Sequence, residues 1–143
     1  MNTDYPSDSI TLYHYTTTQG YEAIMKSQMI QMSTDGRQDA AFGEGVYLKS
    51  LPPNGSYTQV QIAQNNYNGA YQYNIEKTKF CLGFAIPAGE VKDYSKSGRD
   101  AWLLEAKDLY FKEYLPFWVG EYVEEQDAYK VFDINWCGLY IIH

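Results

Sequence analysis

The chain has 143 residues, 45% hydrophobic and 20% charged, a composition typical of a globular protein that excludes an extended disordered chain. This length predicts a single domain spanning 1–143, with a loose polar tail at 1–8. The net charge is −7 and the 11 basic residues are scattered along the sequence, which argues against a nucleic-acid-binding protein.

The hydropathy of the chain and its small number of histidines and cysteines exclude further kinds of protein. No run of about 18 apolar residues is present, so we expect no transmembrane segment, and the polar N-terminus is unlike a signal peptide. Cys81 and Cys137 lie in or beside apolar runs and are predicted to be buried free thiols. His14 and His143 are the only histidines and no Cys-x-x-Cys motif occurs, so we expect no metal site.

The first half of the chain predicts two short helices among short strands. Alternating side chains indicate strands, whereas apolar residues at helical spacing after a threonine or serine cap indicate helices. The segments are, in order, a strand at 10–15, a helix at 18–27, an extended piece at 29–32, a loop at 33–42, a strand at 46–48 and a helix from Ser56 to Asn68-Gly69.

The second half predicts strands alone, and most of them are apolar or aromatic. They are expected at 79–87, 101–104, 109–111, 116–123, 129–132 and 138–142. Helices segregated from most of the strands predict an α+β fold with mixed or antiparallel sheets. Neither G-x-G-x-x-G after a strand nor G-x-x-x-x-G-K-[ST] occurs, which excludes the Rossmann and P-loop classes.

Three side chains in separate segments suit a ligand site. His14 lies in the first strand, and Tyr47 follows Gly-x-Gly, where glycine lets a backbone approach a flat ligand closely. Glu121 lies at the end of an aromatic strand. Taken singly, each is more commonly structural: a strand histidine, a tyrosine after a hairpin turn and a solvent-facing carboxylate. If the first and second strands lie side by side, the imidazole and the phenol share one cleft.

The combination resembles a known family. Leu-Tyr-His-Tyr-Thr at 12–16, a threonine-rich helix cap and Gly-Glu-Gly-Val-Tyr-Leu at 43–48 are similar to the His-Tyr-Asp-signature ADP-ribosyltransferase domains of polymorphic toxins. Those domains belong to the wider class of diphtheria toxin and poly(ADP-ribose) polymerase. The resemblance is close over 11–53, and Glu-Tyr-Val at 121–123 is similar to the motif that carries the glutamate of the class. It implies an ADP-ribosyltransferase-like fold of two packed sheets that binds NAD and needs no metal.

The resemblance implies a role for each matching residue of the first two strands. His14 is expected to hydrogen-bond the adenosine ribose of NAD. Tyr15 and Thr16 belong to the segment whose backbone holds the nicotinamide amide. Tyr47 is expected to stack on the nicotinamide ring, where attraction between the pyridinium charge and the aromatic face contributes about 0.5–2 kcal/mol.

The acidic and remaining cofactor-binding positions are expected outside those motifs or at their edges. Glu121 is expected to hydrogen-bond the nicotinamide ribose, and Asp127 is the alternative, because the third residue of the closest family is Asp. Gly45 is expected to let the backbone approach NAD. Tyr57 and Tyr67 are the candidates for a second stacking tyrosine.

The activity implied is transfer of ADP-ribose from NAD to a macromolecular acceptor, with release of nicotinamide. A protein acceptor is favoured, and transfer to nucleic acid and NAD hydrolysis stay open. Two alternatives are a non-catalytic module that binds NAD or ADP-ribose, and an aromatic-rich β module that binds carbohydrate or protein. We expect a cytoplasmic location, for a freestanding enzyme or a toxin domain delivered into a target cell, with an immunity protein as a further partner. The acceptor, the modified residue and the oligomeric state stay open.

Overall fold

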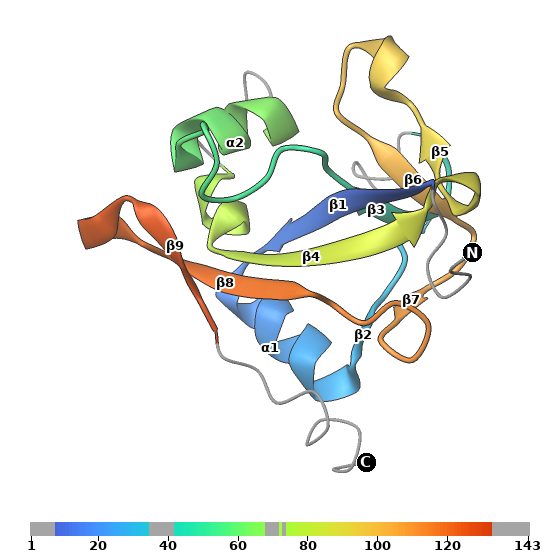
Figure 1. The fold of residues 1–143 in the computed structure, drawn as a ribbon, viewed down its shortest axis with the longest axis horizontal. Coiled ribbons are helices and arrows are strands. Elements are labelled where there is room, and N and C mark those ends of the chain that lie inside the picture. Colours follow the sequence, from blue (N-terminus) through green and yellow to red (C-terminus); the bar gives the residue numbers. More distant parts are fainter. Residues whose placement is uncertain (1–7, 35–41, 68–71, 73, 133–143) are drawn as a thin grey trace.

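The computed structural model describes residues 8–34, 42–67, 72 and 74–132, which form antiparallel sheets and two α-helices. The strands are β1 (Ser9–Thr16), β2 (Met29–Ile30), β3 (Gly45–Leu48), β4 (Phe80–Pro87), β5 (Lys92–Asp93), β6 (Trp102–Glu105), β7 (Leu109–Tyr110), β8 (Trp118–Val123) and β9 (Ala128–Val131). The helices are α1 (Thr18–Ser27) and α2 (Gln59–Tyr67), with 3-10 turns at Ile75–Thr78, Ala88–Glu90, Ser95–Ser97 and Glu124–Gln126. Figure 1 shows β1, β4 and β8 side by side, with α2 above these strands and α1 below them in this view. The predicted α+β class is confirmed.

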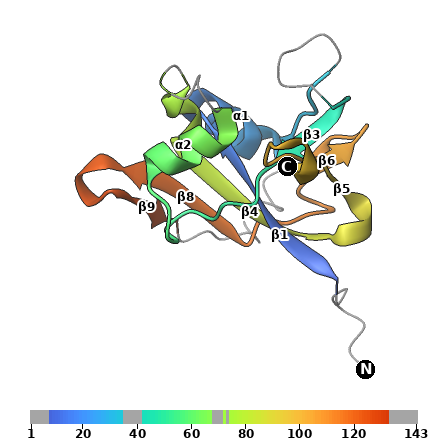
Figure 2. The same ribbon diagram turned by 90° about the horizontal axis from the view of Figure 1, so that it is seen from above.

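The strands of the described residues form three sheets. The largest has the order β1-β4-β8-β9, the second has the order β3-β6-β5, and β2 pairs with β7. All these pairings are antiparallel. The first two sheets meet where Tyr13 and Lys49 exchange two backbone hydrogen bonds of 2.8 Å. Figure 2 shows β9 at one end of the molecule and β5 at the other, with β1 between them.

Helix α1 has the bounds that the sequence predicts. The hydroxyl of Thr17 caps its first turn by accepting a hydrogen bond of 3.0 Å from the Gly20 N–H. Ile24 is the buried residue of its apolar side. The helix ends at Gln28, whose left-handed conformation (φ 58°) lets its N–H bond the Ile24 carbonyl.

Helix α2 begins later than predicted, because its cap is Thr58 and not Ser56. The Thr58 hydroxyl accepts from the Gln61 N–H (3.1 Å), and the Gln61 side-chain oxygen accepts from the Thr58 N–H (2.9 Å). This reciprocal pair is a capping box, which satisfies two backbone donors at once. Ile62 and Ala63 are buried on the inner side of the helix.

Most of the predicted strands are present, and one further strand was not expected. β5 has only two residues, both charged and exposed, so it has no apolar pattern to detect. Cys81 is buried and free, as predicted, and burial raises the pKa of its thiol. The tail at 1–7, most of the predicted loop at 33–42, the end of the second helix at 68–69, the strand at 138–142, Cys137 and His143 lie outside the described residues.

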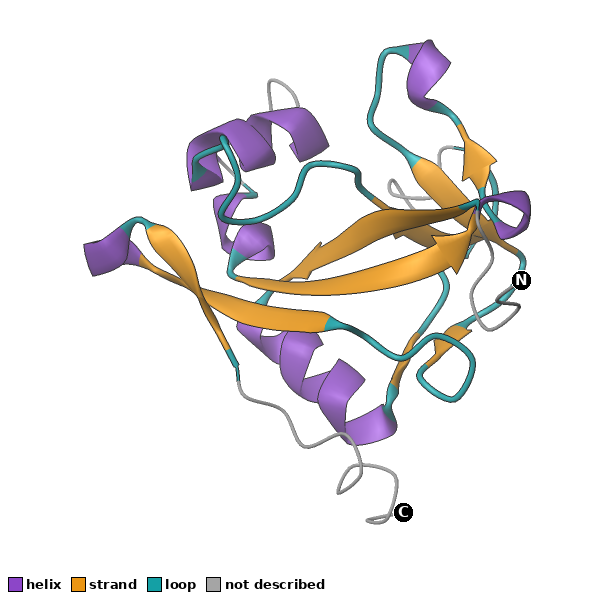
Figure 3. Cartoon of the chain, in the orientation of Figure 1, coloured by secondary structure: helices purple, strands orange, loops and turns teal. Residues whose placement is uncertain are grey.

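Two apolar clusters fix the sheets around the junction of β1 and β3. The larger includes Leu12, Leu82 and Leu104, all at most 1% exposed, and the smaller packs Tyr15 against Ile62. Burying one large apolar side chain contributes about 1.5–3 kcal/mol. β1 pairs with β4 over its full length, so β1 is held on both sides, by β4 and by the contact with Lys49. Figure 3 shows the strands in the middle of the molecule and the helices at its margins.

Candidate functional site

A cleft with a volume of about 340 Å³ opens where β1 meets β3. Among the side chains that line it are five that the sequence singles out: His14, Tyr15, Thr16, Tyr47 and Tyr67. Its volume falls in the range of pockets that hold small molecules and cofactors. The structure therefore brings together the predicted histidine and the predicted tyrosine, which are 33 residues apart in sequence.

The imidazole of His14 lies against the backbone of β3. Its Nδ1 is 3.5 Å from the Tyr47 carbonyl oxygen. Burial, together with the nearby charge of Lys49, lowers the pKa of His14 to about 4 and outweighs the opposing effect of that carbonyl. The ring is therefore neutral at pH 7. With Nδ1 donating to the carbonyl, Nε2 carries the lone pair and can accept a hydrogen bond from a ligand hydroxyl.

The ring of Tyr47 is held in place by its hydroxyl. That hydroxyl donates to the Gly43 carbonyl at 2.5 Å and accepts from the Phe42 N–H at 2.8 Å. The half-buried ring is thus a fixed wall of the cleft. Gly45 packs against β6, where a Cβ atom would lie 2.3 Å from the Leu104 carbonyl oxygen, and it is not among the described residues that line the cleft.

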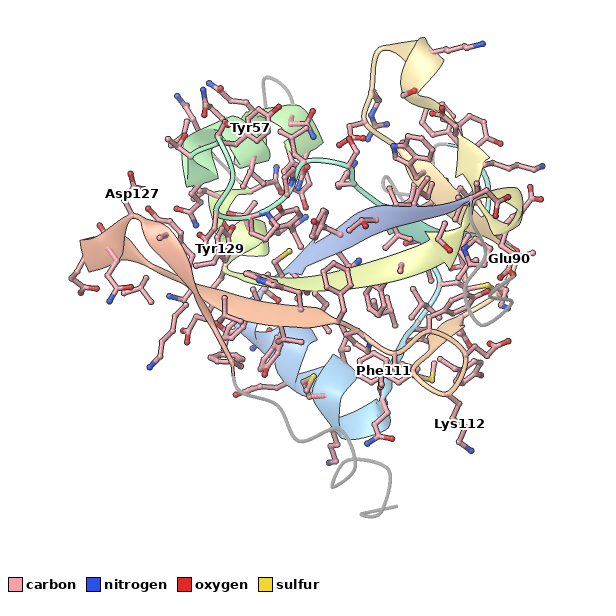
Figure 4. All side chains as sticks on the ribbon, viewed as in Figure 1. Tyr57, Glu90, Phe111, Lys112, Asp127 and Tyr129 are labelled. Carbon is pink, nitrogen blue, oxygen red and sulfur yellow. The ribbon has the colours of Figure 1, made fainter. Side chains whose placement is uncertain are left out.

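The two candidates for the second stacking tyrosine lie in different places. Tyr67, at the end of α2, lines the cleft, and the Lys77 ammonium lies 5.5 Å from the centre of its ring. Tyr57 lines a separate pocket of about 180 Å³ together with Asp127. Figure 4 shows Tyr57 beside α2 and Asp127 at the turn between β8 and β9. The structure therefore brings Tyr67, and not Tyr57, to His14 and Tyr47.

Neither predicted carboxylate is among the described residues that line the cleft. β4 lies between β1 and β8, so Glu121 is two strands away from Thr16, about 10 Å across the sheet. Its carboxylate lies 3.4 Å from the Lys79 ammonium. Asp127 accepts a hydrogen bond of 2.6 Å from the Tyr122 hydroxyl, and this bond is the main cause that raises the pKa of Tyr122 to about 12.

Asp100 is a carboxylate close to the cleft that no sequence motif marks. It follows Arg99, which lines the cleft, and it accepts hydrogen bonds from the Ser50 N–H (2.8 Å), the Asn65 amide (2.8 Å) and the Trp102 indole (3.0 Å). These contacts tie the start of β6 to the segment just after β3. A polar Arg-Asp pair directly before the apolar run at 101–104 was the signal available in the sequence.

The cleft also gathers three basic side chains that the sequence analysis treated as scattered. Lys49, Lys77 and Arg99 all line it, and no carboxylate does so among its described residues. These residues come from three distant segments, so no sequence pattern predicts their clustering. Asn66, which is 3% exposed, is a further polar residue of the lining, and it interrupts the apolar side of α2.

The described residues lack membrane-spanning helices and clusters of metal ligands. No helix there is long and apolar enough to cross a membrane. No group of three or more His, Cys, Asp or Glu side chains there is placed to hold a metal ion.

Comparison with known proteins gives one match. Residues 12–99 match the model of the family described as "HYD1 signature containing ADP-ribosyltransferase" (Tox-ART-HYD1). No curated protein and no solved structure matches significantly. The matched segment contains His14, Tyr47 and the other described residues that line the cleft. Because the match spans more than half of its 143 residues, the chain belongs to the family of HYD1-signature ADP-ribosyltransferases.

Proposed function

We propose that the chain is an NAD-dependent ADP-ribosyltransferase whose substrate binds in the cleft between β1 and β3. The observation that carries this proposal is the convergence of His14 and Tyr47 on one cleft inside the segment that matches the family. An ADP-ribosyltransferase-like fold accounts for the arrangement, with the two main sheets meeting at the substrate. The acceptor is a macromolecule, and the acidic chain, with its net charge of −7, favours a protein over a nucleic acid.

The proposed reaction breaks the bond between the nicotinamide nitrogen and C1′ of the ribose. The electron pair leaves with nicotinamide, an acceptor nucleophile bonds to C1′, and that nucleophile gives up its proton. Positive charge develops on the ribose on the way, as in other glycosyl transfers. Side chains that fix the pyridinium ring and stabilise this charge are therefore the ones that the chemistry needs.

The cleft supplies the positioning groups. Tyr47 stacks on the nicotinamide ring, since its hydroxyl is held by the loop and its ring lines the cleft. His14, neutral at pH 7, accepts a hydrogen bond from a hydroxyl of the adenosine ribose through Nε2. Tyr67, which lines the cleft from the end of α2, is the second aromatic wall.

Asp100 is the favoured acidic residue, ahead of Glu121 and Asp127. It is adjacent to the cleft residue Arg99 and bonded to the strand segment that follows Tyr47. Its three hydrogen bonds leave acceptor capacity, because a carboxylate offers about four lone-pair sites. Glu121 lies in β8, which is on the far side of β4 from β1, and its charge partner is Lys79.

The family name marks these domains as toxins, which supports action in the cytoplasm of a target cell after delivery. An immunity protein of the producing cell is then a further partner. Alternatively, the same activity belongs to a freestanding enzyme that modifies proteins of its own cell.

The second candidate function is a non-catalytic module that binds NAD or ADP-ribose. The observation that favours it is the lack of a carboxylate among the described residues lining the cleft. Nothing else in the cleft distinguishes binding from transfer, so the two functions are separated by whether nicotinamide is released.

The test is nicotinamide release from NAD, followed by mass spectrometry, alongside binding of NAD by calorimetry. We expect release by the wild type and a loss of about 100-fold or more in His14→Ala, Tyr47→Ala and Asp100→Asn. Tyr110→Ala, which removes an exposed tyrosine of β7, is the matched aromatic control and should keep full activity.

Glu121→Gln and Asp127→Asn are the matched acidic controls, and both should remain near wild type. Full activity in Asp100→Asn with loss in Glu121→Gln would overturn the acidic assignment but leave the proposed activity in place. Tight NAD binding without any nicotinamide release would replace the enzyme by the binding module.

A further inference from the structure

The charge of the cleft is opposite to that of the whole chain. The chain carries a net charge of −7, yet three of its 11 basic residues line this one cleft. These are Lys49 just after β3, Lys77 in the 3-10 turn Ile75–Thr78, and Arg99 just before β6. With no carboxylate among the described lining residues, the cleft concentrates positive charge that an anionic ligand can neutralise.

Lys49 is the most constrained of the three. Burial and, to a smaller extent, the positive charge of Arg99 lower the pKa of its ammonium to about 8, against the opposing effect of Asp100. At pH 7 the side chain therefore remains largely protonated beside another cation. The positive charge of Lys49 is also a cause of the lowered pKa of His14, although burial is the larger cause. Lys49 therefore lies near the imidazole. Asp100 offsets part of this repulsion, and an anionic ligand would offset more of it.

Aromatic rings hold the other two cations without neutralising them. The Arg99 guanidinium lies 5.7 Å from the centre of the Phe42 ring, which is stacked on Tyr94. The Lys77 ammonium lies 5.5 Å from the centre of the Tyr67 ring. Contact with an aromatic face orients a cation but leaves its hydrogen-bond donors available, unlike an ion pair.

We propose that Lys49, Lys77 and Arg99 form the subsite that binds the diphosphate of the dinucleotide. This rests on the proposed function, because it takes NAD or ADP-ribose as the ligand. Two linked phosphates carry two negative charges and many acceptor oxygens, which suit a guanidinium fork and two ammonium groups. The diphosphate joins the two riboses, so it lies between the ends of the ligand held by His14 and Tyr47.

The chemistry of the transfer supports this placement. A cation beside the nicotinamide ribose would oppose the positive charge that develops there, whereas a cation at the diphosphate is offset by the phosphate charges and opposes it less. Lys49 lies near His14, the residue assigned to the adenosine ribose, and that ribose is bonded directly to the diphosphate. The subsite therefore strengthens ground-state binding of the whole ligand more than it changes the chemical step.

The experiment is calorimetric titration of the full chain with ADP-ribose and, separately, with adenosine, which lacks the diphosphate. We expect Lys49→Met and Arg99→Met each to weaken ADP-ribose binding by about tenfold, and the more exposed Lys77→Met by about threefold. Adenosine affinity should change by less than about twofold in all three. Lys49→Arg, which keeps the charge, should bind ADP-ribose nearly as well as the wild type.

Lys112→Met is the matched control, since Lys112 is exposed on the loop after β7, away from α2 in Figure 4, and should leave binding unchanged. If the three cleft variants bind ADP-ribose as the wild type does, the subsite is wrong while the proposed function stands. If the wild type binds neither ADP-ribose nor NAD, both fail. If the variants lose binding of a short single-stranded oligonucleotide but keep that of ADP-ribose, the cations serve a nucleic-acid acceptor and the proposal is overturned.

Discussion

The His14 imidazole stays neutral in the folded chain at pH values where an exposed histidine is charged. Its pKa is about 4 when folded, mainly through burial, against 6.5 for an unperturbed histidine. Between these values the unfolded chain binds a proton that the folded chain does not, so stability falls as pH drops from 6.5 toward 4. Above pH 6.5 the residue is neutral in both states and its contribution is constant.

We expect this one residue to lower the free energy of unfolding by about 2 kcal/mol at pH 4.5 relative to pH 7, after allowance for its partial exposure. Urea denaturation of the wild type and of His14→Gln at both pH values measures this contribution. The effects of the other titrating groups are the same in the two proteins and cancel when their losses of stability are compared. Equal losses of stability in the two proteins would show that His14 is protonated in the folded state as easily as in water.

At the scale of elements, Gly45 is the point on which the pairing of β3 with β6 depends. Its φ of 151° is a conformation that L side chains rarely adopt, and a Cβ atom would lie 2.3 Å from the Leu104 carbonyl oxygen. The backbone of β6 would have to move, and β3 carries Tyr47. The expected role of Gly45 as a residue that lets NAD approach is untested, and its visible contact is with β6.

Gly45→Ala is expected to destabilise the fold by about 3 kcal/mol, measured as the change in denaturant midpoint at constant m-value. Gly43→Ala is the matched control, because Gly43 also has positive φ (114°) but no atom within 4 Å of its added Cβ. It should cost only about 1 kcal/mol. Similar losses in both variants would mean that backbone conformation, and not crowding against β6, limits this strand.

Elements with a strong local signal were predictable from the sequence. The bounds of α1 follow from a threonine cap and an apolar side, and β4 follows from its continuous apolar run. The cap of α2 was missed because Ser56 and Thr58 are both good caps, and only the side chain of Gln61 selects Thr58. β5 was missed because two charged residues in a ladder carry no periodicity.

At the scale of the whole molecule, the site was only half predictable. His14 and Tyr47 were found because each lies in a local motif. Which carboxylate lies near the cleft depends on strand order: with β4 between β1 and β8, Glu121 lies away from the cleft, while β6 beside β3 brings Asp100, the acidic residue of our proposal, toward it. Strand order is set by long-range packing, and a single sequence does not encode it in any short window.

The contrast between a chain of charge −7 and a basic cleft predicts the effect of salt on ligand binding. The cations of the cleft attract an anionic ligand at short range, whereas the excess of acidic residues belongs to the chain as a whole, and salt screens both interactions. We expect ADP-ribose affinity to fall by about threefold between 0.05 and 0.5 M salt. In the triple variant Lys49→Met/Lys77→Met/Arg99→Met only the repulsion from the acidic chain remains, so added salt should leave affinity unchanged or raise it.

The contact between Tyr13 and Lys49 has a mechanical consequence. Among the described strands of the two main sheets, these are the residues whose backbones bridge from one sheet to the other. The joint is reinforced by the larger apolar cluster, to which both sheets contribute buried side chains, among them Leu12 of β1 and Val46 of β3. The cleft beside the joint is therefore framed by two sheets that share one core, and loss of these two hydrogen bonds would loosen the walls of the cleft as well as the fold.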